Sequence, residues 1–285
     1  MKTTIPSETL RKLLFANLEP VLQEWLTDKL VSAINPPSAR DLFLTYTLIG
    51  RKFTKNQVVI EEEVSDSATF TYLKYHQITL DQLARIYVLN AALESEPEYF
   101  VPKIGTLMQV ADTGELIAFL RYLCVLQRAD AFTTIAVDAL RTNISDVFDA
   151  IALANPYPEQ YFNEGQWNQM YLKAAFMQRD LLGIQGVNTR ANAALTKIIS
   201  DYAHERWAAS RDIDPHIWQP VSHFLDEVLL SDMKRLLNSS QLAEQRAGYL
   251  CCMASKDARA KTLIARHPVT KEYESQPFDW HSLNT

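Results

Sequence analysis

The residues best suited to chemistry cluster in one stretch, 155–176, which reads NPYPEQYFNEGQWNQMYLKAAF. Pro156 and Pro158 are expected to end one helix there, because the residue before a proline is pushed out of the helical region. The next helix is predicted to begin at Glu164 or Gly165. This junction would place a group of amide, aromatic and lysine side chains close together.

Several of these side chains could form a binding site. Gln169 and Lys173 lie one helical turn apart with Asn168 beside them, so the lysine and the two amides could hold an anion or a carbonyl group while aromatic rings cover an apolar body. The predicted ligand-binding residues here are Asn155, Tyr157, Trp167, Asn168, Gln169 and Lys173. The alternative is structural: amide side chains often satisfy the backbone groups that a proline break leaves free, and the rings would pack the core.

A second polar cluster lies in DYAHERWAASRDIDP, residues 201–215. It adds His204, Glu205, Arg206 and Trp207 to the predicted ligand-binding residues, since Arg206 beside Trp207 could pair with a carboxylate. A solvated helix face with internal ion pairs is the plainer interpretation.

Motifs for other chemistries are missing from the sequence. HERWA is not the HExxH of a zinc helix, and His216 and His223 have no third ligand placed by spacing, so no metal site is predicted. The sequence contains no DDxxD, no phosphate-binding glycine loop and no GxSxG. No catalytic residue and no cofactor are therefore predicted.

Helical patterns surround both clusters. Leucines at 3/4 spacing run through residues 7–34, where Pro20 predicts a kink or two short helices. Capping patterns at Ser38, Thr79 and Asp112 each predict a helix start. Further helices are expected over 129–142, 144–154, 191–210, 216–237, 241–254 and 256–266. Residues 51–69, with VVIEEEV, are expected to be a long connection and hold the one plausible strand.

The fold class that these patterns predict is all-α. Paired helices joined by short turns favour an irregular α-solenoid of HEAT-like hairpins, with a compact multi-helix bundle as the alternative. We expect a single domain over 1–285, which could divide into an N-terminal half, 1–128, and a motif-bearing C-terminal half, 129–267. The last segment, 268–285, is proline-broken and is expected to be irregular.

Composition narrows the function classes. The chain has 285 residues, 47% of them apolar, and a formal net charge of −6, which argues against a nucleic-acid partner. Three cysteines without framework spacing indicate reduced thiols. The N-terminus, MKTTIPSETLRKLLF, lacks the apolar segment of a signal peptide, and no run is long enough for a transmembrane segment. A cytoplasmic location is therefore expected.

The two clusters together resemble a known family. NPYPEQYFNEGQWNQMYLKAAF and GVNTRANAALTKIISDYAHERWAA, with RTNISDVFDAIALANPYP before them and DPHIWQPV after them, are similar to the signature of the EboA family of metabolite-traffic proteins. The resemblance is strong over about residues 138–225 and weaker elsewhere, and residues 51–78 are more polar than the family pattern. The matching positions are Asn155, Pro156, Tyr157, Pro158, Phe162, Trp167, Asn168, Gln169, Leu172, Lys173 and the run from Asp201 to Trp207.

This resemblance implies a role in secondary metabolism. Members are encoded in a gene cluster beside a membrane prenyltransferase and several soluble enzyme-like proteins, and the cluster makes or moves a metabolite or its precursor towards the cell envelope. The resemblance carries over no catalytic residue. It implies a small metabolite, or proteins of the same cluster, as partners.

Three functions follow as hypotheses. The first is a non-catalytic helical protein that binds a metabolite, its precursor or a partner protein. The second is an enzyme acting on a small aromatic or prenylated compound, with Lys173 or His204 as acid/base and Asn168 or Gln169 as electrophilic donor. The third is a scaffold for the cluster's enzymes, which would show an exposed apolar patch.

Overall fold

The computed structural model describes residues 4–60, 68–265, 267–268 and 270–283, and these form an all-α fold. Within this described part no strand occurs, and two isolated bridges, Ile34 with Pro37 and Gln57 with Thr79, are the extended pairings. The predicted strand around VVIEEEV lies partly in residues 61–67, outside the described residues. Internal contacts divide the chain into two compact units, 1–151 and 152–285. A single domain, and a solenoid or bundle arrangement, stay predictions.

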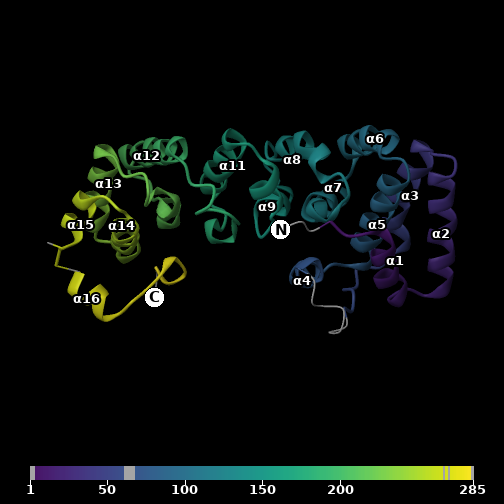
Figure 1. The fold of residues 1–285 in the computed structure, drawn as a ribbon, viewed down its shortest axis with the longest axis horizontal. Helices are drawn as coiled ribbons and strands as arrows, with labels where there is room; N and C mark the ends of the chain where they lie inside the picture. The colour runs from purple at the N-terminus through teal and green to yellow at the C-terminus, as the bar shows by residue number, and fades with distance from the viewer. Residues whose placement is uncertain (1–3, 61–67, 266, 269, 284–285) are drawn as a thin grey trace. The chain divides into compact units, whose positions relative to one another are not determined.

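The first unit is built from helices, most of which are joined by short connections (Figure 1). Its elements are α1 (Ser7–Ala16), α2 (Pro20–Ile34), α3 (Ala39–Lys52), α4 (Ala68–Tyr75), α5 (Leu80–Ser95), α6 (Pro97–Val110), α7 (Thr113–Tyr122), the 3₁₀ turns η2 (Leu123–Val125) and η3 (Ala129–Phe132), α8 (Thr133–Ala139) and α9 (Ser145–Ala152), which reaches the unit boundary. Pro20 divides the first predicted helix in two, as expected, because it occupies the first turn of α2.

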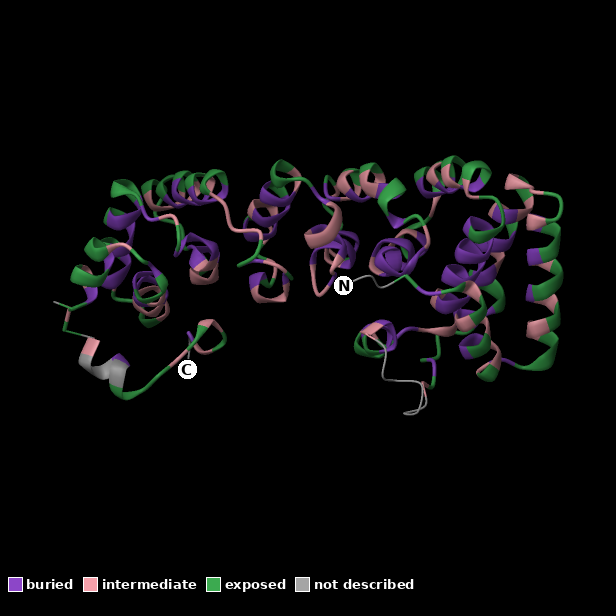
Figure 2. Ribbon diagram, in the orientation of Figure 1, coloured by how far each residue is buried: buried purple, intermediate pink, exposed green. Residues whose placement is uncertain are grey.

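Helix α5 is the centre of the first unit. It packs against α1, α2, α3, α6 and α7, and it is buried along most of its length (Figure 2). The buried ion pair of Arg85 with Asp81, whose Nη1 and Oδ2 atoms are 2.8 Å apart, lies on this helix. A helix surrounded on all sides needs such internal pairs for any charge that it carries inward.

The second unit carries every predicted site residue. Its elements are α10 (Tyr157–Tyr161), α11 (Glu164–Phe176), η4 (Leu181–Gly183), α12 (Ala193–Ala208), η5 (Pro215–Val221), α13 (Glu227–Leu237), α14 (Leu242–Ala254), α15 (Ala258–Ala265), α16 (Thr270–Ser275) and η6 (Trp280–Ser282). Helix α14 is its centre and packs against α13, α15 and η5. Gly248 allows the close approach of α13, since a Cβ atom there would lie 2.9 Å from Cβ of Leu236.

One predicted helix, 216–237, is wrong. Residues 215–221 form the 3₁₀ turn η5 instead, and α13 begins only after Asp226, whose carboxylate accepts a 2.9 Å hydrogen bond from the amide of Leu229. Pro220 explains the break, because it has no amide hydrogen to continue a helical ladder. After this break, α13 packs against α12 and α14.

The C-terminal segment, expected to be irregular, contains α16 and η6 and is tied to the second unit. Arg246 on α14 donates hydrogen bonds to the carbonyl oxygens of Ser282 (2.9 Å) and Leu283 (3.2 Å). The guanidinium of Arg246 also lies over the Phe278 ring, 5.0 Å from its centroid. These contacts hold the segment against α14.

The cysteines are buried thiols. Cys251 lies on α14 and its Sγ donates to the carbonyl oxygen of Trp218 at 3.2 Å. Burial raises the pKa of the Cys251 thiol well above its ordinary value and that of Cys252 to about 12. Neither side chain therefore presents a reactive thiolate at neutral pH.

Candidate functional site

Asn155 stabilises the backbone at the double-proline junction. Its side-chain Oδ1 accepts a 2.9 Å hydrogen bond from the amide of Tyr157, the first residue of α10, and the residue is buried. The ring of Tyr157 is buried too, and it packs against Tyr161 and Phe162 at centroid distances of 4.6 and 6.1 Å. Asn155 therefore satisfies a backbone amide at the proline break, and Tyr157 packs in the core, as the structural alternative predicts.

Helix α11 carries the other predicted residues of this stretch. Trp167 is fully buried and stacks on Tyr171, with ring centroids 5.5 Å apart and planes inclined by 11°. Its indole Nε1 finds no hydrogen-bond partner in the described part of the chain. The Tyr171 hydroxyl donates to the carbonyl oxygen of His216 at 3.2 Å, which joins α11 to η5.

Asn168 forms a reciprocal amide pair. Its Nδ2 donates to Oδ1 of Asn192 at 3.1 Å, and Nδ2 of Asn192 donates back to Oδ1 of Asn168 at 2.9 Å. Asn192 is also the N-cap of α12, since its Oδ1 accepts from the amide of Leu195 at 2.8 Å. The pair fixes the start of α12 against α11. Gln169 is exposed and Lys173 is half-buried on the same helix.

A buried carboxylate joins α12 to α13. Asp232 on α13 is buried; its Oδ2 accepts from the Ser200 hydroxyl at 2.7 Å, and its Oδ1 lies 2.6 Å from Nε2 of His204. Both partners are on α12. This arrangement differs from a nucleophilic triad, because the carboxylate and not the imidazole lies between the other two groups. Its evident effect is to fix the register of the two helices.

Trp207 on α12 and Arg235 on α13 are also in contact. Each lies three residues after the His204–Asp232 contact. The Cζ atom of Arg235 lies 4.2 Å from the centroid of the Trp207 ring, and Trp207 also stacks on the buried Trp218, with centroids 5.8 Å apart and planes inclined by 21°. The His204 ring lies beside the Trp207 ring, with the two centroids 5.6 Å apart. The half-buried indole is therefore held in place by neighbours from three elements.

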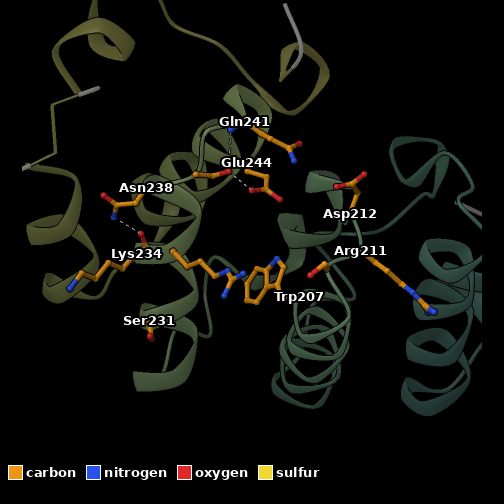
Figure 3. Close-up of a pocket in the computed structure, with 11 residues that line it drawn as sticks. Trp207, Arg211, Asp212, Ser231, Lys234, Asn238, Gln241 and Glu244 are labelled. Atoms are coloured by element: carbon orange, nitrogen blue, oxygen red, sulfur yellow. Dashed lines mark hydrogen bonds between the residues drawn. The ribbon is translucent and has the colours of Figure 1, made fainter.

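An open cavity of about 690 Å³ lies beside this stack, and we call it the Trp207 cavity (Figure 3). One wall comes from the end of α12 and the segment after it: Trp207, Ser210, Arg211 and Asp212. The other wall comes from α13 and the turn into α14: Ser231, Lys234, Arg235, Asn238, Ser239, Gln241 and Glu244. Glu244 accepts a hydrogen bond from the Ser239 hydroxyl, so this turn is ordered by its own side chains.

A smaller cavity of about 280 Å³ lies next to the segment that follows α12. It is lined by Tyr202 and Arg206 of α12, by the exposed Phe176 and by residues 212–214. Arg206 donates through Nε and Nη2 to the carbonyl oxygen of Asp212, at 3.0 and 2.6 Å, which holds that segment against α12. Asp212 borders both cavities.

The structure thus brings part of the predicted set together. Trp207 lines the larger cavity and Arg206 the smaller one, whereas His204 and the exposed Glu205 lie on the same helix. Sequence reasoning missed Lys234, Arg235 and the turn that follows them. The adjacent basic pair near the end of α13 is a signal, but basic residues are common in a last helical turn, where they offset the helix dipole. Nothing in the spacing places this pair opposite Trp207.

The sequence model of a family described as Metabolite traffic protein EboA matches residues 6–222. The chain belongs to the EboA family. The match includes α10, α11, α12 and the Trp207 wall of the cavity, whereas the wall from α13 lies beyond it. No protein of curated function and no solved structure shows a significant match to this EboA-family chain.

Within residues 4–60, 68–265, 267–268 and 270–283, no group of three His, Cys, Asp or Glu side chains is arranged to hold a metal ion. In the same part of the chain, no helix combines the length and apolar character that crossing a bilayer requires.

His216 gives the second unit a pH-dependent contact. Its Nδ1 lies 2.7 Å from Oδ1 of Asp214 and its Nε2 lies 3.0 Å from the carbonyl oxygen of Trp280, so both ring nitrogens face acceptors. The hydrogen bond to Asp214 raises the pKa of His216 despite partial burial. Burial opposes ionisation of Asp214, but its hydrogen bonds with His216 leave the pKa of that carboxyl below its ordinary value.

We expect this contact to stabilise the fold over a limited pH window. The raised pKa of His216 contributes stability that is fully present below its unfolded pKa of about 6.5 and is lost as the pH rises through the folded pKa. The lowered pKa of Asp214 contributes stability above about pH 3.9 that is lost as the pH falls through its folded pKa. Urea denaturation across this range should show the difference between wild type and His216→Gln shrinking at alkaline pH; a difference that stays constant would contradict the assignment.

Proposed function

We propose that this chain binds a small metabolite in the Trp207 cavity and holds it for transfer without converting it. The observation that carries the proposal is the cavity itself. Its volume of about 690 Å³ falls among known small-molecule sites, which span about 300–1,000 Å³. The family description, a metabolite traffic protein, supports the same role.

The aromatic wall of the cavity favours binding because it is rigid. Trp207 is held by its contacts with Trp218 and Arg235, so a ligand would meet a surface that is already formed. A preformed site loses less conformational entropy when it binds. Polar groups from the turn after α13 would then orient the ligand.

The positions of the residues that the enzyme hypothesis requires favour a non-catalytic role. Asn168 is engaged with Asn192, and His204 with Asp232. Neither Asn168, Gln169, Lys173 nor His204 lines the Trp207 cavity. These placements support the binding hypothesis over the enzyme hypothesis.

The test uses the purified full chain and the low-molecular-mass fraction of an extract of its source cells. We expect native mass spectrometry to show a retained mass, and thermal denaturation to show a raised melting temperature, for the wild type. Trp207→Leu should lose both while keeping its helical circular dichroism. The matched control is Trp25→Leu in the first unit, because Trp25 is also half-buried and lies near a ring and a cation, Phe53 and Lys52.

Two results would overturn binding in the Trp207 cavity, and a third would overturn the non-catalytic role. One is that the wild type retains no compound from the fraction. The other is that the wild type, Trp207→Leu and Trp25→Leu all retain the same compound, because binding would then occur outside the Trp207 cavity. If the compound released from the chain had a different mass from the compound that was bound, the chain would have converted it. This result would show catalysis and would contradict the non-catalytic role.

A further inference from the structure

We infer that the ligand of the Trp207 cavity is a polar molecule with an anionic carboxylate or phosphate group, and that Arg235 receives this group. The inference rests on the proposed function and names the ligand class of the same site. It begins from the Arg235 guanidinium, which lies over the Trp207 ring at 4.2 Å. Such stacking occupies the face of the guanidinium and leaves its N–H edge available.

Those N–H groups have no partner in the part of the chain that the structure describes. The Arg235 side chain forms no hydrogen bond or ion pair there, and its contact is the indole ring. Five donors in a fixed plane match the oxygens of a carboxylate or phosphate, which they can bind through two parallel hydrogen bonds. The stack therefore presents an anion-binding group whose orientation is already restricted.

The charges around the cavity favour an anion as well. Its lining holds three cations, Arg211, Lys234 and Arg235, and two carboxylates, Asp212 and Glu244. The lining is thus formally positive by one charge, in a chain whose net charge is −6. In Figure 3, Lys234 and Arg211 extend away from Trp207, and their flexible side chains have no side-chain partner in the described residues. Both side chains are long and flexible enough to reach a bound anion.

The lining argues against a hydrocarbon ligand. Trp207 is the single apolar side chain that borders the cavity, and the remaining lining residues are charged or carry hydroxyl or amide groups. Asn238, Ser239 and Gln241 would offer hydrogen bonds to hydroxyl or carbonyl groups on the body of the ligand. A compact oxygenated acid satisfies these groups, whereas a long prenyl chain would leave most of them without partners.

The experiment compares charged and neutral probes of nearly the same shape. Titration calorimetry of the full chain would use 4-hydroxybenzoate, phenyl phosphate and the neutral 4-hydroxybenzamide. We expect at least one of the two anions to bind and the amide to bind about ten-fold or more weakly. The two anions separate a carboxylate site from a phosphate site. Raising the salt concentration should weaken binding of the anion, since salt screens exposed charge pairs.

Variants assign the effect to Arg235. Arg235→Gln should weaken anion binding by about ten-fold or more, and Arg235→Lys should fall between this variant and the wild type, because it keeps the charge but loses the paired donors. Lys197→Gln is the matched control, since Lys197 is an exposed cation on α12 that does not line the cavity.

The outcomes separate this inference from the proposed function. Equal binding of the benzoate and the benzamide, or unchanged anion binding in Arg235→Gln, would overturn the inference and leave the cavity as a binding site. No anion binding at about 10 mM would also overturn it, because even a weak charge-assisted pair should be detected at that concentration. The proposed function fails separately, when the wild type retains nothing from the cell fraction.

Discussion

Replacement of Trp167 by alanine is expected to lower the free energy of unfolding by about 3–5 kcal/mol. Trp167 is fully buried on α11, and its indole stacks on Tyr171. Removing the ring takes away its transfer free energy and leaves a cavity that the surrounding helices fill only in part. The change should appear as a lower midpoint in urea denaturation followed by far-UV circular dichroism.

The control for this prediction is Trp25→Ala, in which a half-buried ring is removed from α2. Because Trp25 already exposes part of its surface to water, its loss should destabilise the chain by clearly less. If the two variants lost the same amount, Trp167 would not be the core anchor that the structure indicates. If Trp167→Ala were as stable as the wild type but failed to bind ligand, Trp167 would be a ligand contact, as the sequence predicts.

The second large effect is expected at the Asn168–Asn192 amide pair. Asn168→Ala should lower the free energy of unfolding by about 2 kcal/mol, because it removes a buried amide and the two reciprocal hydrogen bonds that it forms with the half-buried Asn192. Asn192→Ala should cost a similar amount, since it also removes the N-cap of α12. The double variant should lose less than the sum, by about 1 kcal/mol, because both single changes break the same pair.

Gln169→Ala is the neighbouring control. Gln169 is exposed on the same helix, so its replacement should change the free energy of unfolding by no more than about 0.5 kcal/mol. Fully additive effects of Asn168→Ala and Asn192→Ala would show that the amide pair is not formed. Loss of ligand binding in a fully stable Asn168→Ala variant would instead support Asn168 as a ligand contact.

Local signals predict the starts of several helices. Ser38 caps α3 by accepting from the amide of Asp41, and Asp112 and Glu115 form the capping box of α7. Such caps depend on residues three positions apart, so the sequence alone can reveal them. The prediction that one helix runs through 216–237 is wrong because Pro220 cannot donate the backbone hydrogen bond that would continue the helix. Asn163 and Gln166 form a capping box of the same pattern at the start of α11.

The site was harder to predict because it depends on tertiary packing. The residue types in 155–176 suit either ligand binding or structural hydrogen bonding, and only the fold shows that Asn155 supports α10 and that Asn168 meets Asn192. Trp207 was among the predicted residues, but its neighbour Arg235 is 28 positions away in the chain. Their contact depends on Asp232 fixing α13 against α12, which no local pattern encodes.

The most direct test of the Trp207 cavity is hydrogen exchange mass spectrometry. The full chain would be compared with and without the cell fraction that raises its melting temperature. Our account predicts slower exchange in two separated segments, 207–212 and 231–244, with little change elsewhere, because these segments form the two walls of the cavity. Protection confined to 155–173 would contradict the account, because it would place the ligand on the double-proline junction and α11.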